Sequence, residues 1–534
     1  MTSPPAESES RPGRSARDCV TIELLPLGQR LSVERGAPLH DVLFAQGVEF
    51  ACGGRGRCRK CKVRVLEGSL PVTPDDVRLL ARAEIDEGWR LACRGQAGGD
   101  LKIELAQWEA AILADDSTFA FTPQDGLGVA IDLGTTTLVA QLLDRRTGHV
   151  LAVRTALNNQ ARYGADIMSR VEFGSTHAGQ SLLEKLIREQ LGQLIVELLA
   201  AAPGRKTGLK EVVIVGNTVM HHLFCGINVK PLAHHPFEPE YYGMQMFQAQ
   251  NLGWNLAGNP TVRFLPCLGG FVGSDILAGI LATKLHESEV PLALIDLGTN
   301  GEIVVGNRER LLCASTAAGP AFEGARISMG MRAVTGAISE VNLVEGRLRC
   351  RVLGNTVPRG ICGSGLVDAV AAGLDLGWVK SNGRLANGGT LTIAAPVVLS
   401  QGDVRELQLA KGAIAAGLRI LAQRWGAGLE GLSRIYLAGA FGNYINRASA
   451  RRIGLIDFPP DKVQPAGNTA LLGAKLALFN LSENEGRYAH VLRKIEHVPL
   501  NEDPAFQDIY VEEMGFPESM TGSGRLHPLA LERP

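Results

Sequence analysis

The sequence has almost no net charge and no long apolar run. Its 54 Lys and Arg residues nearly balance 55 Asp and Glu residues, which gives a net charge of −1 at pH 7. Such a chain has no overall field that attracts nucleic acid or an anionic membrane, and we expect neither as a partner. No stretch reaches the roughly 18 apolar residues of a membrane span, and the N-terminus lacks the apolar core of a secretion signal. We therefore expect a cytoplasmic protein.

Cysteine is also scarce, because ten residues among 534 are too few for a disulfide scaffold. Five of the ten nevertheless lie within the first hundred residues. Glycine, in contrast, is abundant at 63 residues, and we expect the surplus in turns and ligand-binding loops. At roughly 100–200 residues per domain, the length predicts three or four domains.

Apolar periodicity divides the chain into segments. Residues 1–18 have no such period and predict a disordered tail. Residues 19–106 predict a compact α+β unit that has two strands, a helix, a Gly-rich loop, a strand at 62–68, a helix over 74–84 and a last strand at 100–105. Residues 107–126 predict a linker. From residue 127 apolar strands alternate with helices, which predicts an α/β fold with lobes at 127–290 and 291–518, before a frayed tail at 519–534.

An internal repeat indicates that the α/β part is duplicated. The segment VAIDLGTTTLVAQLLDRRTG at residues 129–148 matches LALIDLGTNGEIVVGNRER at residues 292–310. Each copy predicts a strand, a DLGT turn and a second strand. Asp132 and Asp296 occupy the same place in the two copies, which are one domain length apart.

Three clustered cysteines and one distant cysteine form the first candidate site. Cys52, Cys58 and Cys61 lie in the segment FACGGRGRCRKC, and Cys93 lies in RLACRG. Iron–sulfur clusters need thiolate ligands, and four thiolates complete the coordination of two irons. Zinc is the alternative, but zinc sites usually pair two short-spaced couples of ligands. The spacing favours a 2Fe–2S cluster, and Cys19 is expected to be a packing thiol.

These motifs resemble a 2Fe–2S ferredoxin domain of the β-grasp type over residues 19–106. Five residues separate the first two cysteines, whereas plant-type ferredoxins have four, so the spacing is closer to the adrenodoxin-like branch. Basic residues crowd this loop, and they fit either a solvated rim or a docking patch for an acidic partner. They are Arg55, Arg57, Arg59, Lys60, Lys62 and Arg64.

The two DLGT turns form the second candidate site. A Gly-Thr turn between two strands offers N–H groups and hydroxyls to an anion, and the Asp at the strand end can hold Mg²⁺ through water. Two facing copies would bind a polyphosphate from both sides. The P-loop motif, which would indicate another class of nucleotide-binding protein, is absent. The candidate residues are Asp132, Gly134, Thr135, Thr136 and Thr137 in one copy and Asp296, Gly298, Thr299 and Asn300 in the other.

Two later segments extend this pattern. STAAGPAFEGARI places Gly319 where a helix should start, with N–H groups free for phosphate. RIYLAGAFGNYI leads a strand into a small-residue turn at Gly439, where backbone can lie flat against a base. In GNTVMHHL, we favour packing and capping over a metal site for His221 and His222.

Taken in order, these pieces resemble the nucleotide motifs of the actin, sugar kinase and seventy-kilodalton heat-shock ATPase superfamily over residues 127–480. The resemblance implies an actin-like fold that binds ATP and Mg²⁺ in a cleft between two lobes. It implies that Asp132 and Asp296 organise Mg²⁺ and the attacking water, that Glu323 lies near ribose or metal, and that Gly439 contacts adenosine. Glu302 is a candidate for the carboxylate that orients the water.

The whole chain resembles the ATP-dependent reductive activators of corrinoid-dependent methyltransferase systems. The shared features are the 2Fe–2S domain followed by DLGTTT, GNTVMHHL, DLGTNGE, GPAFEGA, CGSGL and LAGAFGN. Relatives with 4Fe–4S clusters carry extra C-terminal cysteines, whereas this chain has none after Cys362, which places it in the 2Fe–2S branch. The resemblance implies electron transfer from the cluster to cobalt(II), which regenerates cobalt(I).

The implied partners are a corrinoid protein and an upstream electron donor, and homodimer formation is left open. Two other functions fit the same motifs. A redox-gated ATPase switch would use the cluster as a sensor, and a small-molecule kinase would transfer phosphate from the cleft.

Overall fold

The structure is a computed structural model that describes most of the chain. The described residues are 18–25, 29–44, 48, 56, 61–105, 121–164, 166–202, 208–298, 300–324, 326–331, 333, 336–353, 357–386, 388–480 and 489–518. The predicted tails at 1–18 and 519–534 and the predicted linker at 107–126 lie wholly or mostly outside these ranges. The exact domain boundaries therefore stay predictions.

The N-terminal domain is a five-stranded mixed sheet in the order β2-β1-β5-β3-β4. Strand β1 pairs antiparallel with β2 and parallel with β5, while β3 pairs antiparallel with both β5 and β4. Its elements are β1 (Cys19–Leu25), β2 (Gln29–Glu34), α1 (Leu39–Phe44), β3 (Lys62–Glu67), α2 (Pro74–Leu79), α3 (Arg82–Asp86), β4 (Trp89–Leu91), η1 (Ala92–Arg94) and β5 (Leu101–Leu105).

Alternation along β1 fixes which face of this sheet is buried. Val20, Ile22 and Leu24 point inward and are at most 3% exposed. Side chains alternate across a strand, so Cys19 points outward and is exposed. The expectation that Cys19 is a packing thiol is therefore wrong, and the phase of the alternation is the reason.

The helix predicted over residues 74–84 is two short helices. Leu80 ends α2 with an extended backbone conformation (φ −101°, ψ 148°). The Glu84 carboxylate accepts a hydrogen bond from the Ala81 N–H, which starts α3 afresh. Local helical periodicity continues across this break, so the sequence pattern did not reveal it.

The first lobe is a six-stranded sheet in the order β10-β11-β9-β6-β7-β8. Its strands are β6 (Leu127–Leu133), β7 (Thr137–Asp144), β8 (Val150–Leu157), β9 (Leu209–Gly216), β10 (Gln245–Gln248) and β11 (Thr261–Phe264). Its helices are η3 (Asn159–Arg162), α5 (Ile167–Gly174), α6 (His177–Ala200), α7 (Thr218–Cys225), η4 (Lys230–Ala233), η5 (Ala249–Leu252), α8 (Ser274–Ala282) and η6 (Leu285–Glu287).

The second lobe has a six-stranded sheet in the order β21-β20-β12-β13-β14-β22, and two small sheets, β16-β15-β17 and β18-β19. Its strands are β12 (Leu292–Leu297), β13 (Gly301–Gly306), β14 (Leu311–Thr316), β15 (Ala337–Val344), β16 (Arg347–Val352), β17 (Gly360–Ile361), β18 (Thr390–Ala394), β19 (Val397–Ser400), β20 (Arg434–Ala438), β21 (Val463–Gly467) and β22 (Ile495–His497). Its helices are η7 (Pro320–Glu323), α9 (Gly363–Asp375), α10 (Gln401–Trp425), α11 (Gly439–Tyr444), α12 (Arg447–Arg452), α13 (Thr469–Phe479), η9 (Leu500–Glu502) and α15 (Phe506–Met514).

The two large sheets repeat one topology. In the first lobe β6 pairs antiparallel with β7 and parallel with β9, and in the second lobe β12 pairs antiparallel with β13 and parallel with β20. Asp132 and Asp296 stand at the same position of β6 and β12. The predicted duplication and the predicted fold class, a β-grasp ferredoxin domain followed by a duplicated actin-like domain, are confirmed.

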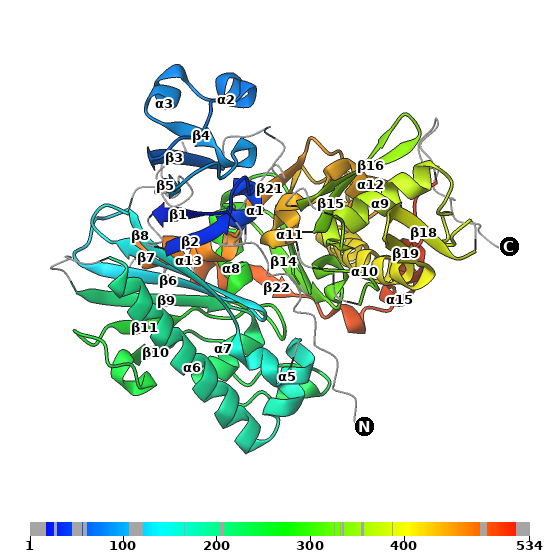
Figure 1. Cartoon of the computed structure of the whole chain (residues 1–534). Coiled ribbons are helices and arrows are strands. Elements are labelled where there is room, and N and C mark those ends of the chain that lie inside the picture. Colours follow the sequence, from blue (N-terminus) through cyan, green and yellow to red (C-terminus); the bar gives the residue numbers. More distant parts are fainter. Residues whose placement is uncertain are drawn as a thin grey trace, which may run out of the picture.

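Two helices cross between the lobes. Although α13 follows β21 of the second lobe in sequence, it packs against β6 and β9 of the first lobe, while α8 contacts both β9 and β12 (Figure 1). The helices approach closely because glycine stands at their contact. A Cβ added at Gly473 of α13 would lie 2.2 Å from the Ala278 carbonyl oxygen of α8.

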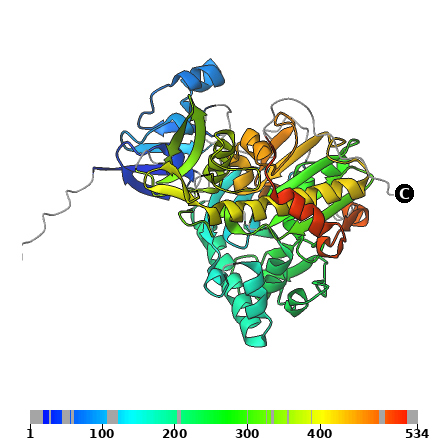
Figure 2. The same cartoon turned by 90° about the vertical axis from the view of Figure 1, so that its right-hand side faces the viewer.

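The C-terminal segment lies along the second lobe. Helix α15 packs on the long helix α10 (Figure 2). The fully buried Lys411 of α10 donates a hydrogen bond to the Gly515 carbonyl (2.6 Å) just after α15. Within the described residues, no helix combines the length and the apolar character needed to cross a bilayer.

Candidate functional site

The first DLGT turn joins β6 to β7 and is held by backbone and amide contacts. The Gly134 N–H donates to the Thr137 carbonyl (3.1 Å), and a Cβ at Gly134 would lie 2.5 Å from that oxygen. Asn158 fixes the turn from outside, because its side-chain amide donates to the Gly134 carbonyl (3.1 Å) and its N–H donates to the Thr136 carbonyl (2.9 Å). Thr135 is buried and its hydroxyl accepts a hydrogen bond from Asn217 (2.9 Å).

The second turn, between β12 and β13, is tighter. The Gly298 N–H donates to the Asn300 carbonyl (3.0 Å), whereas Thr299 lies outside the described residues. The register pairs Asp296 with Glu302, but it pairs Asp132 with Val139 in the first lobe. Glu302 therefore has no acidic counterpart in the first copy, and the site is asymmetric.

Four carboxyl groups at or near the two turns interact electrostatically with one another. Burial raises the pKa of Asp132 to about 6, while a hydrogen bond from the Asn468 amide (2.9 Å) opposes this change. Burial, and then the nearby carboxylate of Asp132, raises the pKa of Asp296 to about 7. The pKa of Asp275 rises to about 8, through burial and then through Asp296 and Asp132.

Glu302 completes this carboxylate cluster. Burial is the largest reason that the pKa of Glu302 lies well above its ordinary value, and the charges of Asp275 and Asp296 add to it. The Ser315 hydroxyl lies 3.5 Å from the Glu302 carboxylate. Like charges near one another at low dielectric favour protonation of the carboxyl groups. Within the described part of the chain, no three His, Cys, Asp or Glu side chains are grouped closely enough to hold a metal ion by themselves.

Sequence reasoning missed two members of this site, Asp275 and Asn468. Asp275 lies in the first turn of α8, and Asn468 caps α13 by accepting a hydrogen bond from the Leu471 N–H (2.8 Å). Asp275 could have been recognised in the segment GGFVGSDILAGIL, because there an acidic residue follows several glycines at the start of a helix. Asn468 is 336 residues from Asp132, and no local pattern connects the two.

The predicted sites at Gly319 and Gly439 have different surroundings. Gly319 adopts a positive φ of 77° and faces open space, but only the single 3₁₀ turn η7 follows it. The helix expected there ends at once, because Gly324 turns the chain back with φ 80°. A Cβ at Gly439 would lie 2.6 Å from the Asp296 carboxylate, so Gly439 lies beside the carboxylate cluster. Adenosine contact by Gly439, and a ribose or metal contact by the half-buried Glu323, stay predictions.

His221 and His222 lie in the core of the first lobe. Both are fully buried in α7, which Asn217 caps by accepting a hydrogen bond from the Met220 N–H (3.0 Å). The His221 ring packs edge-on against Phe264, and His222 Nδ1 lies 2.8 Å from the Thr218 carbonyl oxygen. Burial lowers the pKa of His221 to about 3 and that of His222 to about 4. These contacts are those of packing residues on a capped helix.

Two of the four predicted cluster ligands can be placed. Cys61 and Cys93 are buried, at 1% and 9% exposure. The Ala92 N–H donates to the Cys61 carbonyl (3.0 Å), which joins the two ligand-bearing segments beside β3 and β4. Cys52 and Cys58 lie outside the described residues. Two buried thiols at neighbouring strand ends fit the thiolate chemistry that an iron–sulfur cluster requires.

Two cations of the basic run have partners within the domain. Lys62 forms an ion pair with Glu84 (2.8 Å) and lies over the Trp89 ring, and Arg64 donates to the Glu87 carbonyl (3.1 Å). These contacts favour a structural role for both residues. Arg55, Arg57, Arg59 and Lys60 lie outside the described residues.

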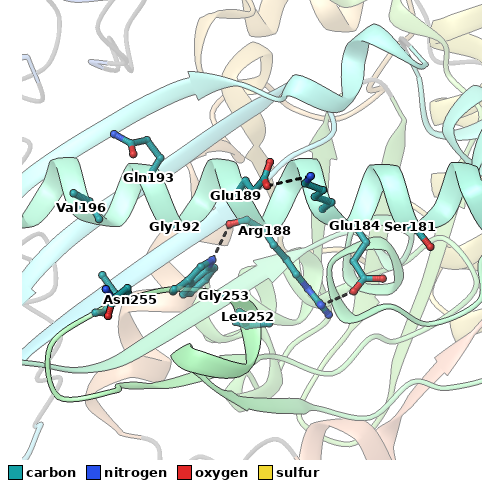
Figure 3. A pocket seen from close by; sticks show the side chains of 13 residues that line it. Ser181, Glu184, Arg188, Glu189, Gly192, Gln193, Val196, Leu252, Gly253 and Asn255 are labelled. Atoms are coloured by element: carbon teal, nitrogen blue, oxygen red, sulfur yellow. Dashed lines mark hydrogen bonds and ion pairs between the residues drawn. The ribbon is translucent and has the colours of Figure 1, made fainter.

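A separate groove of about 600 Å³ lies on the first lobe, between α6 and the residues around η5 (Figure 3). The Trp254 indole N–H donates to the Arg188 carbonyl (2.8 Å), and ion pairs join Arg188 to Glu184 and Lys185 to Glu189. No predicted site residue lines this groove. Its lining residues are Ser181, Glu184, Lys185, Arg188, Glu189, Gly192, Gln193, Val196, Leu252, Gly253, Trp254, Asn255 and Leu256.

Three family descriptions match successive parts of the chain. They are a 2Fe–2S iron–sulfur cluster binding domain over residues 22–97, the RACo middle region over residues 127–288, and the C-terminal ASKHA domain of RACo over residues 291–524. The fold and these matches define the class, which is a 2Fe–2S domain joined to an ASKHA domain of the actin and sugar kinase type.

Relatives identify the family within that class. The chain is 35% identical to the corrinoid activation enzyme RamQ of Eubacterium limosum over 74% of this chain and 71% of that protein. It is 26% identical to the [Co(II) methylated amine-specific corrinoid protein] reductase of Methanosarcina barkeri over 73% of this chain and 77% of that protein. The solved structure of a reductive activator for a corrinoid, iron–sulfur protein matches 93% of this chain and 98% of that chain, with a TM-score of 0.66 and 26% identity. The chain belongs to the family of ATP-dependent reductive activators of corrinoid proteins.

Proposed function

We propose that this protein uses ATP to drive one electron from its 2Fe–2S cluster to the cobalt(II) of a corrinoid protein of a methyltransferase system, which regenerates cobalt(I). The carrying observation is that one chain of this family joins a ferredoxin domain with buried thiols to a duplicated domain with a carboxylate cluster. An upstream donor, whose identity the fold leaves open, would return the electron to the cluster.

The residues that would hold the cluster are Cys52, Cys58, Cys61 and Cys93. A bound 2Fe–2S cluster supplies one-electron chemistry that the side chains alone lack. The burial of Cys61 and Cys93 would keep water from the ligands, and the Ala92–Cys61 backbone bond would fix their separation.

The residues that would organise Mg²⁺–ATP are those of the two turns and the carboxylate cluster. Mg²⁺ takes oxygen ligands and keeps several waters, which suits half-buried Asp132 and Asp296. Gly134, Thr135, Thr136 and Thr137 would contact the phosphates from one lobe, and Gly298, Thr299 and Asn300 would do so from the other. Asp275 and Glu302 are the candidates that orient the attacking water, because both carboxyl groups interact with Asp296 beside the second turn.

ATP is needed because the electron transfer is uphill. Each ~59 mV of unfavourable one-electron potential costs about 1.4 kcal/mol, so a gap of roughly 200 mV costs about 4.7 kcal/mol. ATP can supply this free energy only if it binds one conformational state of the complex more tightly than the other state. A conformational change at the proposed nucleotide site must therefore be coupled to the ferredoxin domain.

Helix α13 offers the physical connection between them. At its start, Asn468 donates to the Asp132 carboxylate (2.9 Å). At its end, the Phe479 ring packs edge-on against Phe121, which lies 16 residues beyond Leu105, the last residue of the ferredoxin sheet. The Gln124 side chain donates to the Phe479 carbonyl (3.4 Å). A shift of Asp132 on nucleotide binding would thus reach the segment that leads to the ferredoxin domain.

Anaerobic visible spectroscopy with matched variants tests the proposal. The pre-reduced protein should produce the cobalt(I) spectrum when it is mixed with a cobalt(II) corrinoid protein and Mg²⁺–ATP. Cys58→Ala should lose the cluster and retain ATP binding, and Asp132→Ala should do the reverse. ATP turnover that follows the redox state of the cluster without cobalt(I) would favour the switch, and a phosphorylated small molecule would favour the kinase.

A further inference from the structure

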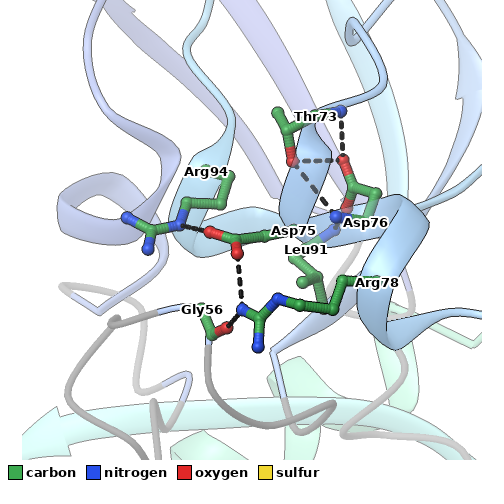
Figure 4. A network of polar contacts seen from close by, with 7 residues as sticks. All are labelled: Gly56, Thr73, Asp75, Asp76, Arg78, Leu91 and Arg94. Carbon is green, nitrogen blue, oxygen red and sulfur yellow. Dashed lines mark hydrogen bonds and ion pairs between the residues drawn. The ribbon is translucent and has the colours of Figure 1, made fainter.

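A carboxylate between two arginines links the segments that carry the predicted cluster ligands. Arg78 of α2 donates through Nη2 to the Gly56 carbonyl (2.6 Å) and to Asp75 Oδ1 (2.5 Å). Arg94 donates through Nε to Asp75 Oδ2 (2.6 Å). Figure 4 shows the Asp75 side chain between Arg78 and Arg94, with Gly56 beside Arg78.

The residues in these contacts lie next to the predicted cluster ligands in the sequence. Gly56 lies between the predicted ligands Cys52 and Cys58, and Arg94 directly follows Cys93. Gly56 has a φ of 64°, and a Cβ there would lie 2.5 Å from Asp75 Oδ2 and 2.6 Å from Arg94 Nε. The backbone at Gly56 thus packs directly on the ion pairs, and its left-handed φ favours glycine.

Helix α2 is a rigid base for these contacts. Thr73 caps the helix, and its N–H donates to the buried Asp76 carboxylate (2.7 Å). The other Asp76 oxygen accepts a hydrogen bond from the Leu91 N–H (2.7 Å), two residues before Cys93. A short helix inserted between β3 and β4 is therefore fixed to the strand that leads to a predicted ligand.

We propose that Asp75, Arg78 and Arg94 are positioning residues that hold the two ligand-bearing segments together and adjust the reduction potential of the cluster. Two guanidinium groups and one carboxylate give the network a net positive charge. A reduced cluster carries one more negative charge than an oxidised one, so this charge favours the reduced state and raises the potential. The inference rests on the proposed 2Fe–2S site but not on the corrinoid reaction.

The exposure of these side chains separates this role from a general contribution to folding. Asp75 is 25%, Arg94 38% and Arg78 56% exposed. Ion pairs with this exposure contribute little to global stability. Their removal should therefore change the cluster while the unfolding temperature of the cluster-free protein stays nearly constant.

Three variants of the full-length protein test the proposal, with Arg82→Gln as the control. Arg82 lies in α3 of the same insertion, is 86% exposed and forms an ion pair with Asp86 (3.2 Å). For each variant, the midpoint potential is measured by anaerobic redox titration, and cluster loss is followed by visible absorbance in excess chelator. Thermal unfolding of the cluster-free protein reports on the fold.

Arg78→Gln should lower the midpoint potential and speed cluster loss about tenfold, the effect of losing a charge-assisted hydrogen bond. Arg78→Lys, which keeps the charge, should restore the potential. Asp75→Asn should shift the potential upward, opposite to Arg78→Gln, because it removes a negative charge. Arg82→Gln should change neither quantity.

The proposal is overturned if Arg78→Gln and Arg82→Gln give the same potential and the same rate of cluster loss. It is also overturned if the cluster-free Arg78→Gln protein unfolds at a much lower temperature, because the residue would then be a general stabiliser. None of these measurements needs ATP or a corrinoid protein, so the failure of the proposed function would leave the result interpretable.

Discussion

Asp275→Asn should stabilise the nucleotide-free protein increasingly as the pH rises. The folded-state pKa of Asp275 is about 8, against an ordinary value of 3.8. A carboxyl group whose pKa is raised by folding contributes stability that is complete below about pH 4 and is lost as the pH rises toward 8. The wild type therefore loses stability over this range, and the amide variant does not.

The magnitude follows from the pKa. Between pH 5 and pH 8 each pH unit is worth about 1.4 kcal/mol, so the advantage of the variant could grow by up to about 4 kcal/mol. Asp275 is half-buried, and screening by the solvent that reaches its side chain reduces this gain to roughly 2 kcal/mol. For a lobe of this size, roughly 2 kcal/mol raises the Tm by about 4–8 °C.

Differential scanning calorimetry at pH 5 and pH 8, without nucleotide or Mg²⁺, measures this effect. Asp508→Asn is the matched control, because Asp508 also lies in the first turn of a helix but is exposed. The reasoning is refuted if Asp275→Asn is stabilised relative to the wild type by the same amount at both pH values, or if it is less stable than the wild type at pH 8. The same variant should lose ATP hydrolysis, because the carboxylate cluster would lack one acid.

Three other substitutions probe the contacts around the cleft and the second lobe. Gly473→Ala places a methyl group 2.2 Å from the Ala278 carbonyl, and calorimetry should show a loss of about 1–3 kcal/mol, whereas Gly402→Ala, with only an ordinary contact at 3.5 Å, should not. Asn468→Ala removes the hydrogen bond to Asp132 and should weaken ATP binding about tenfold by calorimetric titration, while an unchanged affinity would show that Asn468 does not position Asp132. Lys411→Met leaves the half-buried Gly515 carbonyl without the Lys411 hydrogen bond and should cost about 1–3 kcal/mol of stability. Faster proteolysis of the C-terminal segment would reveal this loss.

The sequence predicted those parts of the site that depend on local pattern. Asp132 and Asp296 were identifiable because each ends an apolar strand before a DLGT turn, and the turn repeats. The spacing of the cysteines predicted Cys61 and Cys93 as cluster ligands; both are buried, and their role as ligands stays a prediction. The outward position of Cys19 was also readable, since Val20, Ile22 and Leu24 fix the phase of β1.

The remaining features depend on contacts between distant segments. Asp275 and Asn468 reach the site because α8 and α13 cross between the lobes, and their sequence neighbours carry no sign of that crossing. The break between α2 and α3 was missed for another reason, because the local contact that makes it, from the Ala81 N–H to Glu84, leaves the apolar period unchanged. The pairing of Glu302 with Asp296 required the strand register, which the length of the turn sets.

The central claim is that ATP hydrolysis and electron delivery are coupled in one chain. The most direct measurement is a rapid-mixing experiment under anaerobic conditions, in which the pre-reduced protein meets a cobalt(II) corrinoid protein with or without Mg²⁺–ATP. The account predicts that cobalt(I) absorbance appears with ATP, in proportion to the phosphate released, and is absent with Asp132→Ala. Equal cobalt(I) formation without ATP, or phosphate release with no cobalt(I), would contradict it.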